Sequence, residues 1–346
     1  MKIMKKKISM NDIAQELNIS ITTISFILNG KAKEMRISDA LTTKVLEYVK
    51  EKKYNPNAMA QSLRTGKSKI IGLIVEDIAD AFFASVARLI EERAYKKGYK
   101  IIYCSTEDNA KKTVELIRMF KSRNVDGYII TPPKGIESEV SLLLSENLPL
   151  VLFDRFFPEI KTDYVIIDNL IGAKIAVEHL ADQQYKNIAF ITLDSDQTQM
   201  EGRLTGYSEA INKAGLKEYV LKVKFTLKPQ KIVQLVNEFL AGHKEIDAIL
   251  FATNYLALQG FEALNNQNLR IGEDIGVVAF DDHVFFKVFN PPISAISQPM
   301  KDLSENLIDT LFKKLNPDHL QDNQENHTVL QPQLIIRKSS LQKKSI

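Results

Sequence analysis

The sequence is 346 residues long, 45% hydrophobic and 26% charged, with a net charge of +3 and no tryptophan. This composition excludes a disordered or low-complexity chain, and the length predicts two or three domains. No apolar run approaches the ~18 residues of a membrane-spanning helix, no secretory signal follows the first lysines, and the lone Cys104 forms no internal disulfide, so we expect a cytoplasmic protein.

The positive charge is concentrated near the N-terminus. Residues 1–69 contain 14 Lys and Arg and 6 Asp and Glu, a net charge of +8, whereas the remainder contains 32 and 37, a net charge of −5. A basic segment on a mildly acidic body predicts nucleic-acid binding, although basic tails are common in other proteins.

Two short helices joined by a tight turn are predicted first. Ser9 and Asp12 have the spacing of a capping box at the start of one helix, which ends after about two turns near Asn18. Ser20 can cap a second helix over Ile21–Leu28. Two helices with this connection are typical of a helix-turn-helix.

A third helix, capped by Ser38, can close a small core with the first two. The second helix then keeps a polar face of Thr22, Thr23 and Ser25. Helix-turn-helix proteins place such a face in the major groove of DNA. A three-helix bundle without a DNA role is the alternative at this point.

A further short helix is predicted after Tyr54, between Asn55-Pro56 and Gly66. It has about two turns, so we expect it to be ordered only against a partner helix or DNA. Met59 and Leu63 would form an apolar wedge on one side, of the kind that enters a minor-groove base step.

From Lys69 onward, apolar runs alternate with helical patterns. The predicted strands are Ile70–Val75, Lys100–Cys104, Gly127–Ile130, Leu150–Phe153, Ile188–Ile191, Ala248–Phe251 and Ile275–Phe280, and helices are predicted over Phe83–Lys97, Lys112–Arg123 and Leu170–Leu180. This alternation predicts parallel sheets covered by helices, and so many strands favour two lobes.

Chemically distinctive residues follow several of these strands, at the edge where doubly wound sheets bind ligands. They are Phe82 and Phe83, Asp154-Arg155, Arg203, Thr253-Asn254 and Asp281-Asp282. Carboxylates and a guanidinium can bond vicinal hydroxyls while aromatic rings cover an apolar ligand face. Each residue also has a structural explanation, such as core packing, an internal ion pair or a helix cap.

The sequence resembles the LacI/GalR family of repressors over nearly its whole length. The resemblance is carried by Ile13-Ala14, Ser20–Ser25, Leu28–Gly30, Tyr54–Asn57, Ala60–Gly66, Ile71–Leu73, Val125–Gly127, Pro149–Arg155, Ile167–Asn169, His179-Leu180, Gly202–Tyr207, Ile275–Asp282 and Ile296–Pro299. It implies a small all-α helix-turn-helix domain followed by a bilobed α/β periplasmic-binding-protein-like domain with two doubly wound parallel sheets. It also implies a regulator that binds a palindromic operator as a dimer, or a higher oligomer, under the control of a small-molecule effector.

For DNA binding, the resemblance implies a hinge helix at Asn57–Leu63 whose Leu63 enters the operator centre. The residues expected at DNA are Ser20, Ile21, Thr22, Thr23, Ser25, Phe26, Asn29, Tyr54, Asn57, Ala58, Gln61 and Leu63. The family usually has arginine where this chain has Phe26. Phenylalanine has no donor for guanine but can contact a thymine methyl, so we expect a different operator half-site.

For effector binding, the resemblance implies a pocket in the crevice between the lobes. The expected residues are Phe82, Phe83, Asp154, Arg203, Thr253 and Asp281, with Gln197 and Gln199 where some members place further contacts. Thr253-Asn254 replaces the family's Asn-Asp pair, which removes a carboxylate and puts the effector's identity in doubt. A sugar is favoured, and a purine or other metabolite is the alternative.

The expected domains are residues 1–55, a hinge and linker at 56–68, the effector domain at 69–339, and a frayed polar tail at 340–346. Lobe one is expected at about 69–165 plus 300–328, and lobe two at about 166–299 plus 329–339, with one strand over Val329–Ile336. We expect no cofactor, metal or membrane partner. A solute-binding protein lacks the first 68 residues, and the sequence contains no dinucleotide or nucleophile-elbow motif of an enzyme on this fold.

Overall fold

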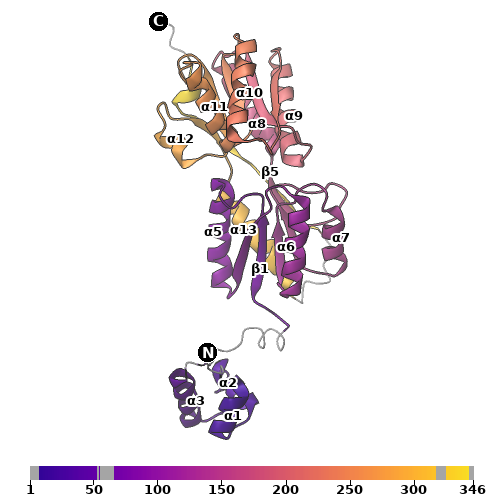
Figure 1. Ribbon diagram of the computed structural model, residues 1–346, viewed down its shortest axis with the longest axis vertical. Coiled ribbons are helices and arrows are strands. Elements are labelled where there is room, and N and C mark those ends of the chain that lie inside the picture. Colours follow the sequence, from indigo (N-terminus) through magenta and orange to yellow (C-terminus); the bar gives the residue numbers. More distant parts are fainter. Residues whose placement is uncertain (1–7, 53, 55–65, 317–324, 343–346) are drawn as a thin grey trace, which may run out of the picture. The chain divides into compact units, whose positions relative to one another are not determined.

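The computed structural model describes residues 8–52, 54, 66–316 and 325–342. The chain forms two compact units, Met1–Ser68 and Lys69–Ile346 (Figure 1). The described part of the first unit is helical, and the second contains two six-stranded sheets covered by helices, which confirms the predicted fold class. Within the described ranges, no helix has both the length and the apolar character needed to cross a membrane.

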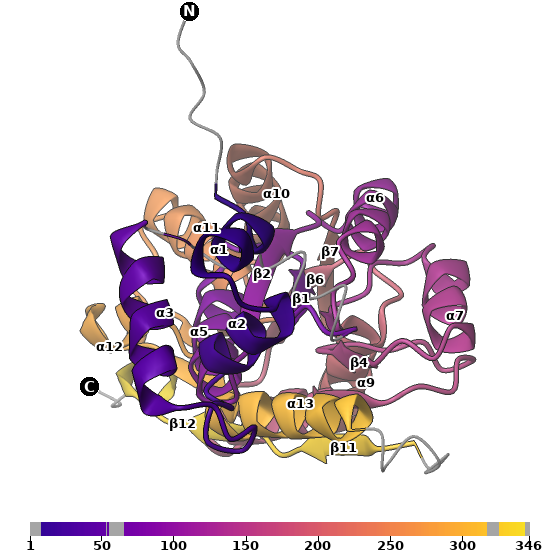
Figure 2. The same cartoon turned by 90° about the horizontal axis from the view of Figure 1, so that it is seen from below.

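The first unit contains α1 (Met10–Leu17), α2 (Ile21–Leu28) and α3 (Asp39–Glu51), gathered around one core (Figure 2). The predicted capping box is present, because the Ser9 amide donates to Asp12 Oδ2 at 2.8 Å and the Asp12 amide donates to Ser9 Oγ at 3.2 Å. The Ser20 and Ser38 side chains also cap α2 and α3, accepting from the Thr23 amide at 3.0 Å and the Leu41 amide at 3.3 Å. Each helix therefore begins where the sequence places a serine.

The first lobe is a parallel sheet with the strand order β11-β5-β4-β3-β1-β2. Its strands are β1 (Ile70–Val75), β2 (Lys100–Ser105), β3 (Gly127–Ile130), β4 (Leu150–Phe153), β5 (Tyr164–Ile167) and β11 (His327–Leu330). Its helices are α5 (Ala81–Lys96), α6 (Ala110–Ser122), α7 (Glu137–Ser145) and α13 (Met300–Leu315). The apolar predicted strands are the buried central ones, as expected for a sheet covered on both faces.

The second lobe repeats this plan with the order β12-β10-β9-β8-β6-β7, in which only β12 pairs antiparallel. Its strands are β6 (Ile188–Leu193), β7 (Tyr219–Val223), β8 (Ala248–Phe251), β9 (Gly276–Phe280), β10 (Ser294–Ser297) and β12 (Gln333–Ile335). Its helices are α8 (Asn169–Asp182), α9 (Thr198–Lys213), α10 (Pro229–Gly242), α11 (Asn254–Asn266) and α12 (Val284–Val288), with a 3₁₀ turn, η2, at Lys338–Ser340.

The chain crosses between the lobes three times, after β5, after β10 and after β11. The predicted single strand Val329–Ile336 in lobe two is wrong. His327–Leu330 pairs in parallel with Tyr164–Ile167 in lobe one, and only Gln333–Ile335 joins lobe two. Pro332, which has no amide hydrogen to donate, lies between the two pairings. Lobe one therefore extends through Ile167 and through Leu330.

The expectation of a frayed tail from residue 340 is also wrong for residues 340–342. The Ser340 side chain is buried and lies 2.7 Å from His179 Nε2 and 2.6 Å from Ser294 Oγ. The Leu341 carbonyl accepts from the Tyr185 hydroxyl at 3.0 Å. These contacts attach the end of the chain to lobe two, which the polar composition did not indicate.

Helices α8 and α9 pack closely because α9 has a glycine at the contact. A Cβ atom on Gly206 would lie 2.1 Å from the Leu170 carbonyl oxygen, which belongs to the backbone of α8. Backbone cannot move aside as a flexible side chain can, so this position admits only glycine.

We predict that Gly206→Ala lowers the free energy of unfolding of the body by about 1–3 kcal/mol, because one of the helices must shift. Gly242→Ala is the matched control, since a Cβ there meets no atom within 4 Å and alanine favours the helix. Chemical denaturation of the two variants checks this, and equal stability would contradict the close approach.

Candidate functional site

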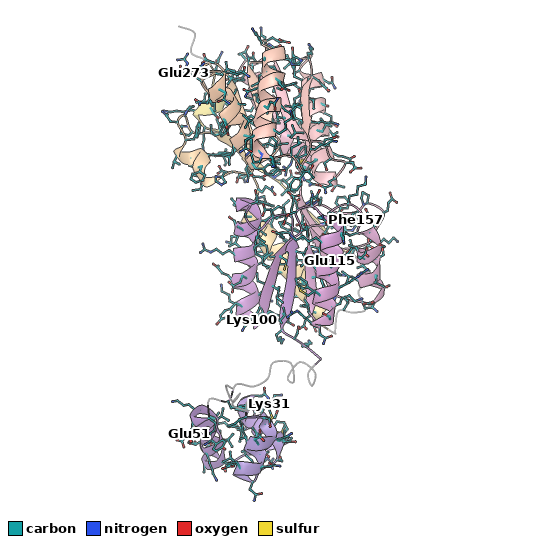
Figure 3. The ribbon with its side chains drawn as sticks, viewed as in Figure 1. Lys31, Glu51, Lys100, Glu115, Phe157 and Glu273 are labelled. Carbon is teal, nitrogen blue, oxygen red and sulfur yellow. The ribbon has the colours of Figure 1, made fainter. Side chains whose placement is uncertain are left out.

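Residues that follow the strands of both lobes line one cavity at the junction of the lobes. The lining residues are Glu76, Asp80, Phe82, Phe83, Asp154, Leu193, Gln199, Met200, Arg203, Thr253, Tyr255, Asp281 and Gln298. They follow β1 and β4 in lobe one and β6, β8, β9 and β10 in lobe two. Figure 3 shows side chains of the two lobes meeting at this junction. The cavity therefore lies at the carboxyl ends of the parallel strands.

Lobe one contributes an aromatic wall. The rings of Phe82 and Phe83, in the first turn of α5, lie 5.1 Å apart between centroids, and both contact Phe153 at 5.7 and 5.9 Å. Phe82 and Phe83 are buried. Such rings suit the apolar face of a ring-shaped ligand, in keeping with the sequence-based interpretation.

Lobe two contributes a fixed guanidinium. Arg203 of α9 donates from Nε to Asn169 Oδ1 at 2.8 Å and from Nη1 to the Ala252 carbonyl at 2.5 Å. Its guanidinium carbon lies 4.1 Å from the centroid of the Phe280 ring. These contacts hold the charge in place before any ligand arrives, so little side-chain entropy remains to be lost on binding.

Two aspartates occupy equivalent places in the two lobes. Asp154 follows β4 and Asp281 follows β9, each after a phenylalanine and each in the left-handed region, with φ of 69° and 67°. Aspartate tolerates this conformation better than most residues. Asp281 Oδ1 accepts from the Gln298 amide at 2.5 Å, and Asp281 Oδ2 lies 4.0 Å from Arg203 Nη1.

A third aspartate, Asp80, caps α5 and was not among the predicted site residues. Its Oδ1 accepts from the amides of Phe82 at 2.8 Å and Phe83 at 3.4 Å. Burial, together with the negative charge of Asp281, raises the pKa of Asp80 to about 6. Only the sequence pattern of a helix cap, Asp80 before Ala81, could have indicated it.

The pKa values of the two aspartates that follow the strands, Asp154 and Asp281, are also raised. Burial raises the pKa of Asp154 to about 6 against the opposing charges of Arg155 and Arg203. Burial also raises the pKa of Asp281, opposed by Arg203. A group of buried acids at one cleft is a common feature of functional sites.

A second polar cluster bridges the lobes beside the cavity. Arg155 is buried and bonds Glu76 Oε2 at 2.5 Å and the side chain of Gln197. Gln197 in turn donates to Asp108 Oδ1 at 2.8 Å. Arg155 is therefore an internal ion-pair residue of lobe one, and Gln197 joins the lobes without lining the cavity.

The structure brings together seven of the eight residues expected at the effector, all except Gln197. They are Phe82, Phe83, Asp154, Gln199, Arg203, Thr253 and Asp281. Thr253 also caps α11, with its Oγ1 accepting from the Leu256 amide at 3.2 Å. Sequence reasoning missed the other six lining residues, Glu76, Asp80, Leu193, Met200, Tyr255 and Gln298.

In the first unit, α2 exposes part of the face expected at DNA. Ile21, Thr22 and Asn29 are exposed, and Thr23 and Phe26 are half-buried. Ser25 is not on this face, because its side chain is only 3% exposed and the Asn29 amide lies 3.2 Å from its hydroxyl. The expected polar face is therefore narrower than predicted.

The other residues expected at DNA fall outside α2 in the sequence. Tyr54 is half-buried against the helical core, and Ser20 bonds the Thr23 hydroxyl at 2.8 Å. Asn57, Ala58, Gln61 and Leu63, with the predicted hinge helix, lie outside the described residues.

Two family models match this chain. Residues 9–57 match the model of bacterial regulatory proteins of the lacI family, and residues 177–340 match a periplasmic binding protein-like domain. The two matches correspond to the helix-turn-helix unit and to most of the second lobe with the end of the chain.

Curated relatives match over nearly the full chain. The regulator RegA of Clostridium saccharobutylicum is 31% identical over 336 residues, covering 96% of this chain and 99% of its own. The repressor PurR of Pasteurella multocida is 29% identical, covering 96% and 98%. The ribose operon repressor of Haemophilus influenzae is also 29% identical, with the same coverage.

Solved structures share the fold. The lac repressor dimer bound to operator and an anti-inducer has a TM-score of 0.83 at 21% identity, covering 97% of this chain and 100% of that one. A regulator from Enterococcus faecium with bound ribose has a TM-score of 0.70 at 22% identity, covering 80% and 100%.

The raised pKa of Asp80 predicts a pH-dependent stability. The pKa of Asp80 is about 6 in the folded protein and about 3.8 in an exposed aspartate. The contribution of Asp80 to stability is therefore lost as pH rises between these two values, and it stays lost at higher pH. We expect Asp80→Asn, which keeps the helix cap, to raise the free energy of unfolding at pH 7.5 by about 2 kcal/mol and to have little effect at pH 4.

Thermal unfolding of the full chain at both pH values measures this effect. Asp309→Asn, at an exposed position of α13, removes the same charge away from the cavity and serves as the control. A gain at pH 7.5 that is equal in the two variants would refute the assignment to the cavity.

Proposed function

This chain belongs to the lacI family of bacterial regulatory proteins, and from that membership we propose that it represses transcription by binding a palindromic operator as a dimer under the control of a small-molecule effector. Its general class, a DNA-binding transcriptional regulator, follows from the family. The dimer, the operator symmetry and the effector are the proposed parts.

The observation that carries the proposal is the presence of two sites on one chain. One is a helix-turn-helix with an exposed α2 face within a basic segment. The other is a cavity between two lobes, lined by carboxylates, a guanidinium and aromatic rings. A DNA reader joined to a ligand-binding cleft supports regulation rather than transport or catalysis.

We propose that the exposed part of α2 reads the major groove. Thr22 can reach base edges or phosphates, and Phe26 can contact a thymine methyl. Because Ser25 is buried, we expect the DNA contacts of α2 to come from Ile21, Thr22, Phe26 and Asn29. The residues of the predicted hinge, Asn57–Leu63, remain part of the proposal on the basis of the sequence.

The proposed effector is a sugar. Aspartate and arginine side chains can bond adjacent hydroxyls, and the rings of Phe82 and Phe83 can cover the opposite face. The ribose complex of the Enterococcus faecium regulator supports this choice. A purine is the second candidate, because aromatic rings also suit a nucleobase and a repressor named PurR is among the relatives.

We propose that a second copy of the chain covers α12. This short helix exposes three apolar side chains, Val284, Phe285 and Val288, which are 65%, 60% and 76% exposed. An apolar patch of this kind favours a protein partner. The similarity to a repressor crystallised as a dimer supports a second copy as that partner.

The position of α12 can couple effector binding to the proposed dimer interface. It begins at Val284, directly after Asp281, Asp282 and His283, and Asp281 lines the cavity. Asp282 is fixed by two bonds to the Arg337 guanidinium at 2.7 and 2.8 Å. A ligand that moves Asp281 can therefore reorient α12, and the coupling to DNA must be reciprocal.

Selection of duplexes from a random pool with the full chain tests the DNA proposal. We expect a palindromic site whose affinity falls steeply with salt. Thr22→Ala and Phe26→Ala should each weaken binding to this site about 10-fold, on the order of 1–2 kcal/mol, with little change in non-specific binding.

Thr43→Ala, at an exposed position of α3, is the matched control and should bind normally. Selection without any sequence preference, or equal losses in all three variants, would count against recognition by α2.

Phe285→Asp and Val288→Asp test the dimer. We expect either change to convert the full chain to a monomer at micromolar concentration, because a carboxylate would be buried without a partner in the interface. Analytical ultracentrifugation measures the mass, and Leu142→Asp, at an exposed apolar position of α7, is the control. Dimers in both α12 variants would place the interface elsewhere.

A further inference from the structure

The cavity between the lobes is lined by more negative than positive groups. Four lining residues are carboxylic acids, namely Glu76, Asp80, Asp154 and Asp281, and one, Arg203, is a cation. In a low-dielectric cleft, this imbalance decides which ligands can enter without leaving a buried charge unpaired.

Two of the acids have strong partners within the protein. Glu76 Oε2 lies 2.5 Å from Arg155 Nη2, so this pair is internally neutral. Asp281 accepts from the Gln298 amide and lies 4.0 Å from Arg203, which is the only cation lining the described cavity. Arg203 also bonds Asn169 and the Ala252 carbonyl, so its position is fixed.

Neither of the other two acids has a cation to itself, because Arg155 is paired with Glu76 and Arg203 is shared with Asp281. Among the described residues, no lysine or arginine nitrogen lies within 4.0 Å of Asp80, which accepts only neutral amide hydrogens, from Phe82, Phe83 and the Asn254 side chain. The ion-pair contact of Asp154 is Arg155 Nε at 3.9 Å, and Arg155 is already paired with Glu76. Burial raises the pKa of both Asp80 and Asp154 to about 6.

We propose that the effector of this cleft is a hydroxylated amine, such as an amino sugar, whose ammonium group is held by Asp80 and Asp154, and that Asp80 determines this specificity. The inference rests on the proposed function, in which the cleft takes the effector. An ammonium group supplies a positive charge that can pair with these two acids. The aromatic rings of Phe82 and Phe83 also favour a cation.

The same charges exclude anionic ligands. A phosphorylated or carboxylated sugar would add negative charge beside acids that already repel each other, as Asp281 repels Asp80. The single guanidinium of Arg203 is shared with Asp281 and cannot offset a phosphate as well. The cleft is therefore selective against sugar phosphates.

The binding affinities of a neutral sugar and of an amine change with pH in opposite directions. An amine binds the ionised acids, so its affinity rises as pH increases through about 6. A neutral sugar held by protonated acids binds more weakly over the same range. The charged or titratable groups around Asp80 and Asp154 are Glu76, Asp77, Tyr103, Arg155, Arg203, Tyr255 and Asp281.

Calorimetric titration of the full chain with matched series of ligands tests the proposal. Each series contains a hexosamine, its parent hexose and the hexose 6-phosphate, built on glucose, galactose and mannose. We expect at least one hexosamine to bind 10-fold or more tightly than its parent hexose, with about a 10-fold gain from pH 5 to pH 7, and no binding of the phosphates.

Asp80→Asn should remove the preference, so that the amine and its parent hexose bind within about threefold of each other, whereas Asp309→Asn should bind as the unmodified chain does. A phosphate that binds, a hexose that binds better than its amine, or no binding by any hexosamine overturns the assignment. If a neutral hexose binds and releases operator DNA, this inference fails while the proposed function stands. A full chain that selects no operator refutes the proposed function instead.

Discussion

The structure depends on one topological constraint, the three crossings of the chain between its lobes. Because the strands of each sheet run parallel, except the short β12, their carboxyl ends gather at one edge, and the crossings hold the two edges together. Asp154 and Asp281 follow equivalent strands and line the same cavity. Acids that lie far apart in the sequence are thereby brought into a low-dielectric space that neither lobe could form alone.

Burial of these acids lowers the stability of the fold and raises their pKa values. Acids that would be ionised in water have raised pKa values here, because burial disfavours their charged forms and Asp281 lies near Asp80. Under the proposed function, a ligand that pairs with these acids would recover part of the free energy that the fold loses in this way. Internal hydrogen bonds fix Arg203 and Gln298 in place, so these groups would favour ligands that match their positions.

Much of the fold was predictable because local rules agree with the tertiary structure. Serines capped the three helices of the first unit, and continuous apolar runs marked the buried central strands. Strands β5, β7 and β10 were not predicted. Lys222 interrupts the apolar pattern of the edge strand β7, and serines begin and end β10. The division of residues 327–335 between two sheets was also missed, because pairing partners more than 30 residues away decide it.

The sequence by itself determined the three helices of the first unit, seven strands of the two sheets, the family and seven of the residues that line the cavity. Six of these residues follow from their position after a strand, and Gln199 follows from the family resemblance. Only the tertiary structure showed that Ser25 is buried, that Arg155 is neutralised by Glu76, and that Asp80 shares a cavity with Asp154 and Asp281. The physical reason is that burial and charge balance depend on all the groups around a residue, and packing brings those groups together from distant parts of the chain.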